Sequence, residues 1–338
     1  MNEHLNRLID SRKEITASAI KESYLGKSND KLIISLFHEH NNKVKQLVGK
    51  DFAPATLQRY ETSLMHVHEY IKKKYMKEDL PVEDIDHDFL SGLEFYLKTV
   101  RNCGHNTTMK YIKNFKKIIR TVHAKGWITK DPFADIKLKL RKVEKEFLTE
   151  DELNAIIETD FKVLRLEHVK DTFLFGCFTG LAYSDLKKLT PENLIQGKDG
   201  NYWIHTKRTK TDNPSHIPLL PPAMEIIWKY KDNPHCLDHH VLLPVYSNQK
   251  LNAYLREIAD LCGIRKKMTT HMARHTFATT VTLNNDIPIE SVSKMLGHSS
   301  IKMTQVYAKL LDKKVAQDMK KLHSKFTMKK EPVMKQIE

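Results

Sequence analysis

The sequence predicts a mainly α-helical protein with one small antiparallel β-sheet, which places it in the α+β class. Apolar residues recur at intervals of three and four through most of the chain, and this is the spacing of one helix face. Residues 201–220 break that pattern with two strand-like runs around a turn that contains Asn213 and Pro214. At 338 residues the chain is long enough for two domains.

The first half of the chain predicts four helices, and their short connections favour a compact bundle. Asp86 precedes the third helix, where its carboxylate can cap the free backbone amides. Gly126 follows the fourth helix and is placed to end it. The expected helices are residues 31–47, 56–75, 86–100 and 106–125.

A charge-rich stretch, residues 136–146, contains few core residues and is expected to link the bundle to a second domain. A basic linker is ordinarily just solvated, but between two domains that face a polyanion it would also lie along the negative charges of that partner. Thr149 and Glu152 form an S/T-x-x-E capping box and predict the first helix of the second domain. After the strand pair, the expected helices are residues 248–262, 272–283, 289–296 and 301–311.

The composition is basic, with 56 Lys and Arg against 42 Asp and Glu and a formal charge of +14. Such an excess favours an acidic polymer or an anionic membrane surface as partner, although a merely basic surface gives the same count. No run approaches the ~18 apolar residues of a membrane-spanning helix, and the N-terminus has no apolar signal core. We therefore expect a cytoplasmic protein that does not enter a membrane.

Neither a metal nor a cofactor is expected from the sequence. The four cysteines are scattered, which does not favour a disulfide framework. Residues 235–240, HCLDHH, contain ligand types that suit zinc, but no second cluster lies at zinc-finger spacing. A Pro-flanked surface loop accounts for this run more simply. No Walker A sequence occurs.

The most informative feature is an ordered set of four residues, His271, Arg274, His298 and Tyr307. A tyrosine that attacks phosphorus needs cations and hydrogen-bond donors around the phosphate, because charge builds on its oxygens in the transition state. The planar guanidinium of Arg274 suits two phosphate oxygens at once. The two histidines can donate to the same oxygens or exchange the proton of the nucleophile. A single tyrosine on an amphipathic helix more often packs into the core. The hypothesis that Tyr307 attacks phosphorus therefore depends on all four residues occurring together.

The segment around these residues, THMARHTFATTVTLNNDIPIESVSKMLGHSSIKMTQVYAKL, closely resembles the tyrosine recombinase (phage-type integrase) family. In that family the tyrosine cuts DNA by becoming covalently attached to the 3′ phosphate. The phrase SNQKLNAYLREIADLCGI is similar to integrases of Bacteroidetes mobile elements. The resemblance implies a remnant of an arm-binding domain over residues 1–28, a SAM-like core-binding domain over 29–135, a linker over 136–146, a catalytic domain over 147–326 and a tail over 327–338.

The resemblance also implies roles for individual residues. Tyr307 corresponds to the nucleophile, and Arg274, His271 and His298 to its phosphate pocket. His275 is expected to be a structural partner that orients its neighbours.

Lys210 resembles the family's hairpin lysine, since Lys210-Thr211 is followed by Ile217-Pro218-Leu219. We expect Lys210 to be the general acid, because the leaving 5′ alkoxide needs a proton. Lys207 is a competitor, although the resemblance favours Lys210. The alternative is that both lysines are plain charges at the tip of a hairpin.

One position departs from the family pattern. The first arginine of the family follows Thr-Gly-Leu, but here Ala182 follows that triplet. The loss of one transition-state donor typically costs about 10²–10³ in rate, so another cation is expected to enter the pocket. Arg208 is the first choice, and Lys170 and Arg165 come next. Asp185 is expected to orient Arg274 or a histidine.

The resemblance implies a site-specific recombinase that integrates or excises a mobile element through a 3′-phosphotyrosine, without metal or ATP. Its implied setting is the bacterial cytoplasm, in association with the nucleoid. The implied partners are double-stranded DNA, other copies of the chain in a tetramer on synapsed DNA, and accessory DNA-bending proteins. Residues 312–326 carry Val315, Met319 and Leu322 at helical spacing, and we expect them to pack on a neighbouring protomer.

Two alternatives to this reading stay open. One is a DNA-binding relative with weakened catalysis that acts in regulation or architecture. The other is a type IB topoisomerase, which shares the pocket but relaxes supercoils.

Overall fold

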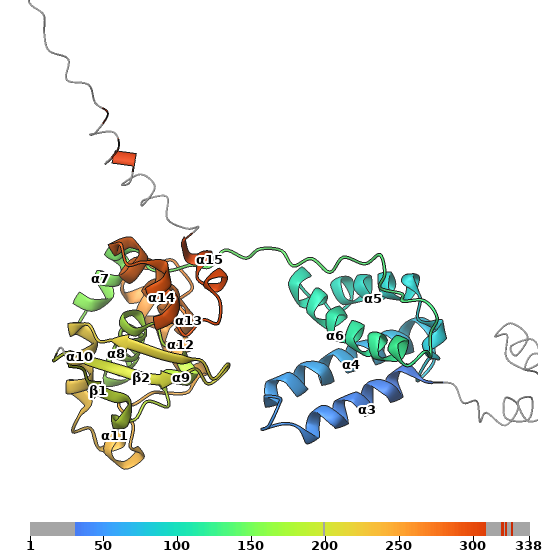
Figure 1. The fold of residues 1–338 in the computed structure, drawn as a ribbon, viewed down its shortest axis with the longest axis horizontal. Helices are drawn as coiled ribbons and strands as arrows, with labels where there is room; N and C mark the ends of the chain where they lie inside the picture. The colour runs from blue at the N-terminus through green and yellow to red at the C-terminus, as the bar shows by residue number, and fades with distance from the viewer. Residues whose placement is uncertain (1–30, 199, 309–318, 321, 323–325, 327–338) are drawn as a thin grey trace, which may run out of the picture. The chain divides into compact units, whose positions relative to one another are not determined.

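The computed structural model describes residues 31–198, 200–308, 319, 320, 322 and 326 (Figure 1). It is mainly helical with one three-stranded antiparallel sheet in the order β1-β2-β3, which confirms the predicted fold class. The chain divides into two compact units between Val143 and Glu144. The expected N-terminal remnant, the tail and all but four residues of 312–326 lie outside the described residues.

The described residues of the first unit form four α-helices, whose ends differ from the expected ones by at most two residues. They are α3 (Ile33–Gln46), α4 (Pro54–Tyr75), α5 (His87–Thr99) and α6 (His105–Ala124), and a short 3₁₀ turn, Val82–Asp84, precedes α5. The Asp86 carboxylate accepts from the Phe89 amide at 2.7 Å, which confirms the predicted cap. Helix α4 packs on α3, α5 and α6, and fully buried aromatic rings such as Phe37 and Phe115 fill the space between them.

The expected linker, residues 136–146, is anchored to the first unit over part of its length. Ile136 and Leu138 pack against the core of the bundle. The side-chain amide of Asn106 donates to the Arg141 carbonyl and accepts from the Arg141 amide, both at 2.8 Å. Because that pair of bonds fixes the backbone at Arg141, the linker is held on the first unit up to this residue.

The second unit surrounds a buried helix, α8 (Leu164–Thr179), which contacts α10, α12 and α13. The predicted capping box is confirmed, since Thr149 and Glu152 exchange side-chain bonds at the start of α7 (Glu150–Glu158). The sheet pairs β1 (Leu194–Gln196), β2 (Tyr202–Lys207) and β3 (Pro214–Pro218). The remaining α-helices are α9 (Tyr183–Leu186), α10 (Pro221–Tyr230), α11 (Pro234–His239), α12 (Asn248–Leu261), α13 (Thr270–Thr276), α14 (Ile289–Met295) and α15 (Gln305–Ala308).

Two expected helices are interrupted. In the range 272–283, α13 ends at Thr276, and a π-helical turn (Phe277–Thr282) and a 3₁₀ turn (Leu283–Asn285) follow. Thr282 donates to the carbonyls of both Phe277 and Ala278, and such threonine bonds compete with regular helix geometry. In the range 301–311, a 3₁₀ turn (Ile301–Met303) precedes α15, and residues beyond 308 are outside the described part.

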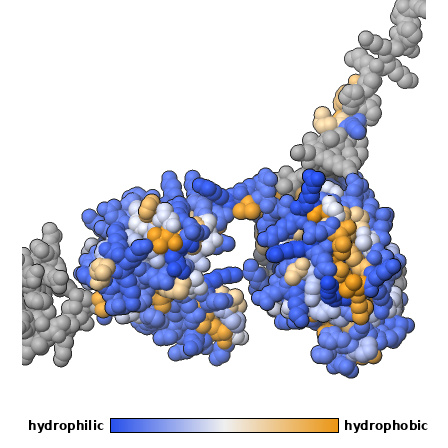
Figure 2. Space-filling model, turned by 180° about the vertical axis from the view of Figure 1, so that it is seen from behind, coloured by the Kyte–Doolittle hydropathy of each residue, from blue (hydrophilic) through white to orange (hydrophobic). Residues whose placement is uncertain are grey.

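Surface hydropathy agrees with the basic composition. Figure 2 shows mostly hydrophilic side chains over both units, with an apolar band on the unit of residues 144–338. Within the described residues, every helix is too short or too polar to cross a membrane.

Candidate active site

The Arg274 guanidinium is buried at the centre of the site, with 3% of the residue exposed. It is the fifth residue of α13 (Thr270–Thr276). Nη1 donates to the Gly180 carbonyl at 2.7 Å and Nη2 to the Leu296 carbonyl at 2.6 Å. Burial lowers its pKa to about 10, which leaves the guanidinium charged at neutral pH. The carbonyls therefore hold a permanent cation in a fixed orientation.

Gly180 makes this arrangement sterically feasible. It ends α8 with a φ of +68°, where side chains are strained. A Cβ there would lie 2.4 Å from Cδ1 of Phe277, the first residue of the π-helical turn. The close approach brings the Gly180 carbonyl to Arg274.

The Leu296-Gly297-His298 segment is the C-terminal cap of α14. The His298 amide donates to the Ser293 carbonyl and the Gly297 amide to the Lys294 carbonyl, and Gly297 is left-handed with a φ of +60°. This pair of bonds is a Schellman motif, which turns the chain sharply after a helix. The motif directs the His298 side chain back toward Arg274.

His298 is neutral, and its hydrogen bonds define its tautomer. Arg274 Nη2 can only donate, so His298 Nε2, 3.0 Å away, accepts. Nδ1 then carries the proton and donates to Thr304 Oγ1 at 2.7 Å. Burial, with the nearby charges of Arg274 and Arg208, lowers the pKa of His298 to about 4. Thr304, which is fully buried, thus fixes the ring.

Tyr307 lies on α15 with its ring parallel to that of His298, at 6.4 Å between centroids and 7° between planes. The residue is 6% exposed, and burial raises its pKa. The positive charges of Arg274 and Arg208 oppose that rise. The tyrosine therefore lies in the cationic environment that the sequence predicted for it.

The two remaining histidines differ in exposure. His275 is buried beside Tyr307, with ring centroids 5.3 Å apart, and burial lowers its pKa to about 3. His271 is exposed, and partial desolvation and nearby cations, Lys145 first among them, lower its pKa. Sequence reasoning missed Lys145, because nothing in the charged linker distinguished it from its neighbours.

Arg208 enters the same site from the β2–β3 hairpin. Its Nε lies 3.2 Å from Asp185 Oδ2, and its Nη1 donates to the Leu296 carbonyl at 3.1 Å. That carbonyl also accepts from Arg274, so two guanidinium groups meet at one oxygen. Asp185 further accepts from the Thr209 amide at 2.8 Å. The ion pair of Asp185 is thus with Arg208, and its charge also acts to raise the pKa of Arg274, the residue that it was expected to orient.

The rival cations make their contacts elsewhere. Arg165 pairs with Glu257 at 3.0 Å, and the Lys170 ammonium donates to the Thr159 carbonyl at 2.7 Å. Ala182 precedes α9, where its methyl group offers no charge.

The two hairpin lysines also differ. Lys210 is exposed in the hairpin turn, and its charge contributes to the lowered pKa of His271. Lys207 lies 3.8 Å from Asp212 in an exposed ion pair. Of these two lysines, Lys210 is the one whose charge contributes to the lowered pKa of His271.

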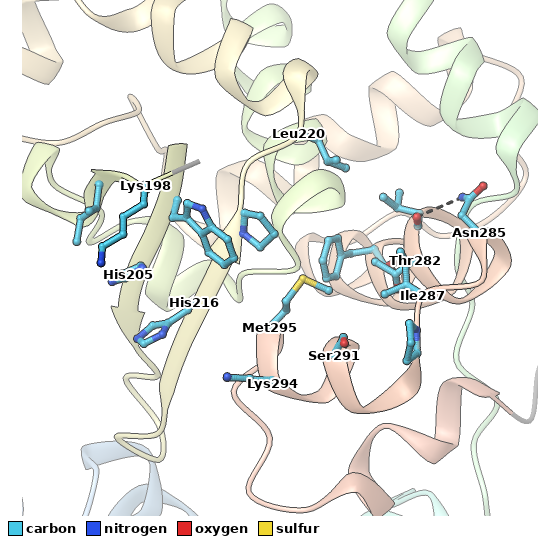
Figure 3. A pocket seen from close by; sticks show the side chains of 17 residues that line it. Lys198, His205, His216, Leu220, Thr282, Asn285, Ile287, Ser291, Lys294 and Met295 are labelled. Atoms are coloured by element: carbon cyan, nitrogen blue, oxygen red, sulfur yellow. Dashed lines mark hydrogen bonds between the residues drawn. The ribbon is translucent and has the colours of Figure 1, made fainter. Parts of the chain in front are cut away.

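A separate cavity of about 990 Å³ lies between the sheet and α14. Figure 3 shows the lining side chains, with His205 and His216 on the strands and Lys294 and Met295 on α14. None of the candidate catalytic residues lines it. Within the described residues, no group of three or more His, Cys, Asp or Glu side chains is arranged to hold a metal, and His240 of the HCLDHH run bonds Glu192 instead.

Comparisons with known proteins match each of the two units to an integrase family model. Residues 146–314 match the model described as the phage integrase family, and residues 32–142 match the phage integrase SAM-like domain. The chain is 25% identical over 272 residues to tyrosine recombinase XerC of Lactobacillus leichmannii, which covers 76% of this chain and 89% of the relative. It is 26% identical over 309 residues to XerC of Pelotomaculum thermopropionicum, covering 85% and 97%.

Solved structures show the same fold. A lambda integrase dimer bound to a COC′ core site has a TM-score of 0.67 at 17% identity, covering 90% of this chain and 85% of that one. The Tn1549 transposon integrase in complex with circular intermediate DNA has a TM-score of 0.62 at 18% identity, covering 82% and 94%.

Proposed function

The chain belongs to the phage integrase family of tyrosine recombinases, and from that premise we propose that it integrates or excises a mobile element with Tyr307 as its nucleophile. Tyrosine recombinases transfer DNA strands without metal or ATP. The observation that carries the proposal is the position of the Arg274 guanidinium, which bonds His298 and whose charge acts on Tyr307. That geometry matches what a phosphoryl transfer to tyrosine requires.

In the proposed reaction, Tyr307 Oη attacks the phosphorus and the P–O5′ bond breaks. Arg274 and Arg208 hold the non-bridging oxygens, on which negative charge develops. The phenolic proton passes to the imidazole of His271, whose lowered pKa keeps it neutral and able to accept. His298 orients Arg274 instead, because both of its ring nitrogens are engaged, with Arg274 and Thr304. Lys210 gives a proton to O5′. The resulting 3′-phosphotyrosine retains the energy of the phosphodiester, so a DNA hydroxyl can reverse the step.

Arg208 supplies the second guanidinium of the site, in the role that Ala182 cannot fill. Three features support this role: its side chain is 13% exposed, its Asp185 partner fixes it, and it shares the Leu296 carbonyl with Arg274. Its charge also acts on Tyr307 and His298. Ala182 itself favours a second candidate function, a DNA-binding relative with weakened catalysis.

The partners we propose are double-stranded DNA and three further copies of the chain. The formal charge of +14 suits a polyanion. The fold is shared with a lambda integrase tetramer bound to a Holliday junction, at a TM-score of 0.65. We extend the proposal to a tetramer on synapsed DNA, to accessory DNA-bending proteins and to a cytoplasmic location at the nucleoid.

The decisive experiment incubates the protein with nicked duplex DNA that carries the end sequence of its element. The nick releases a short fragment after cleavage, which traps the covalent intermediate. We expect a protein–DNA adduct from the wild type and none from Tyr307→Phe, which keeps the ring and its packing. Adduct from Tyr307→Phe would identify another nucleophile. No adduct from the wild type, with DNA binding intact, would favour the DNA-binding relative. In a second assay on supercoiled circular DNA, relaxed circles without recombinants would favour a topoisomerase.

A further inference from the structure

The β2–β3 hairpin is fastened to the end of α14 by three side chains that reach three successive carbonyls. Ser215 Oγ donates to the Met295 carbonyl. Arg208 Nη1 donates to the Leu296 carbonyl at 3.1 Å. Asn213 Nδ2 donates to the Gly297 carbonyl at 3.3 Å.

These carbonyls are available because they close a helix. The last carbonyls of an α-helix have no partner within it and carry partial negative charge. The C-terminal cap of α14 uses the carbonyls of Val292, Ser293 and Lys294 for the amides of Leu296, His298 and Gly297. Those of Met295, Leu296 and Gly297 remain, and hairpin side chains bond each of them.

Both ends of this connection lead into the candidate active site. Lys210 lies in the turn between Arg208 and Asn213, and His298 directly follows Gly297. From this geometry we infer that Asn213 and Ser215 are positioning residues, which hold Lys210 in register with His298 and Tyr307. The inference rests on the proposed function, because it assigns Lys210 the task of protonating the leaving group.

Arg208 is itself placed in the catalytic pocket, so its removal cannot distinguish a positioning effect from the loss of a catalytic group. Removal of the Asn213 or Ser215 side chain can make that distinction. Asn213 is half-buried and its side-chain amide bonds only Gly297 among the interactions of the described chain. Ser215 is 1% exposed in β3, and Ser215→Ala removes one hydroxyl without adding volume. Displacement of a catalytic group by about 1 Å can cost about 10² in rate.

The test uses two cleavage substrates that differ in one atom. In the ordinary substrate, the P–O5′ bond breaks and O5′ takes a proton from the general acid. In the second, sulfur replaces the bridging 5′ oxygen, so the P–S bond breaks and a thiolate leaves without needing that proton. A variant that misplaces only the general acid therefore slows the first reaction and spares the second.

We expect Asn213→Ala and Ser215→Ala to form adduct about 10- to 100-fold more slowly than the wild type on the oxygen substrate, and within about threefold of it on the sulfur substrate. The matched control is Thr211→Ala, since the exposed Thr211 hydroxyl bonds no described residue; it should match the wild type on both. Equal slowing of both substrates, or no slowing of either, would overturn the inference while leaving the proposed function intact. Failure of the wild type on both substrates would overturn the proposed function as well.

Discussion

Arg208 and Asp185 form an ion pair in which Nε lies 3.2 Å from Oδ2, with the side chains 13% and 1% exposed. Arg208 comes from the hairpin, whereas Asp185 lies on α9, three residues after Ala182. The carboxylate thus fixes a guanidinium from the hairpin at the short helix that directly follows Ala182. A buried pair of this kind leaves an uncompensated charge when one partner is removed.

Arg208→Ala is expected to lower the rate of adduct formation by about 10²–10³ with little loss of DNA affinity, because one transition-state donor is lost. The rate is measured on nicked DNA and the affinity by titration. Since Asp185 would be left unpaired, Arg208→Ala/Asp185→Asn separates a folding defect from a catalytic one. Arg165→Ala and Lys170→Ala are matched controls that should cleave normally.

Ala182→Arg should partly restore cleavage to Arg208→Ala, because it returns a guanidinium to the family's position. Cleavage at the wild-type rate by Arg208→Ala alone would make Arg208 a plain hairpin charge.

Arg274→Lys is expected to reduce adduct formation almost as severely as Tyr307→Phe. A lysine ammonium cannot bond Gly180, Leu296 and His298 while also presenting a planar face to the phosphate. Single-turnover rates at saturating protein measure the effect, and thermal unfolding checks the fold. A lysine variant within tenfold of the wild type would show that charge alone suffices.

Lys210→Ala is expected to slow cleavage of the oxygen substrate by about 10²–10⁴, the usual contribution of a general acid. The bridging-sulfur substrate should restore most of that rate. Lys207→Ala is the control on the same hairpin, because Lys207 lies in an exposed pair with Asp212. If the bridging-sulfur substrate restores the rate of Lys207→Ala rather than that of Lys210→Ala, Lys210 is not the general acid.

The second unit is expected to lose stability as the pH falls below 6.5. The pKa of His275 is about 3 in the fold and 6.5 without it. Below pH 6.5 the unfolded chain therefore binds a proton that the folded chain excludes, so stability is present above that pH and falls as it decreases. The loss from His275 is on the order of 2 kcal/mol by pH 5. Thermal unfolding of His275→Gln should depend less on pH than the wild type, whereas the exposed His239→Gln should match it.

Deletion of the residues after Lys313 is expected to spare cleavage of a single site and to impair tetramer assembly. The reason is the apolar spacing in residues 312–326, where Met319, at 57% exposed, and Leu322, at 46%, are accessible for a partner. Cleavage is followed on nicked DNA and assembly by native gel shift or light scattering. Normal tetramers of the truncated protein would indicate that the segment caps its own domain.

Signals local in the sequence predicted the helices of the first unit and the first helix of the second unit. The four helices of residues 33–124 follow from periodicity, and the caps at Asp86 and Thr149 follow from residues within one turn. Such signals depend on neighbours in sequence, so a single chain reveals them. The interruption after Thr276 was missed, because threonine side chains that bond carbonyls are compatible with either geometry.

The sequence by itself determined the class of fold and the ordered set His271, Arg274, His298 and Tyr307, since the types and order of these residues are local facts. Only the tertiary structure decided which of three candidate cations meets Arg274. Arg165 and Lys170 have the right charge, but folding places them against Glu257 and Thr159. Arg208 reaches the site because the hairpin closes on α14 and Asp185 compensates its charge there. Burial and charge pairing of this kind depend on residues far apart in sequence, and no local pattern encodes them.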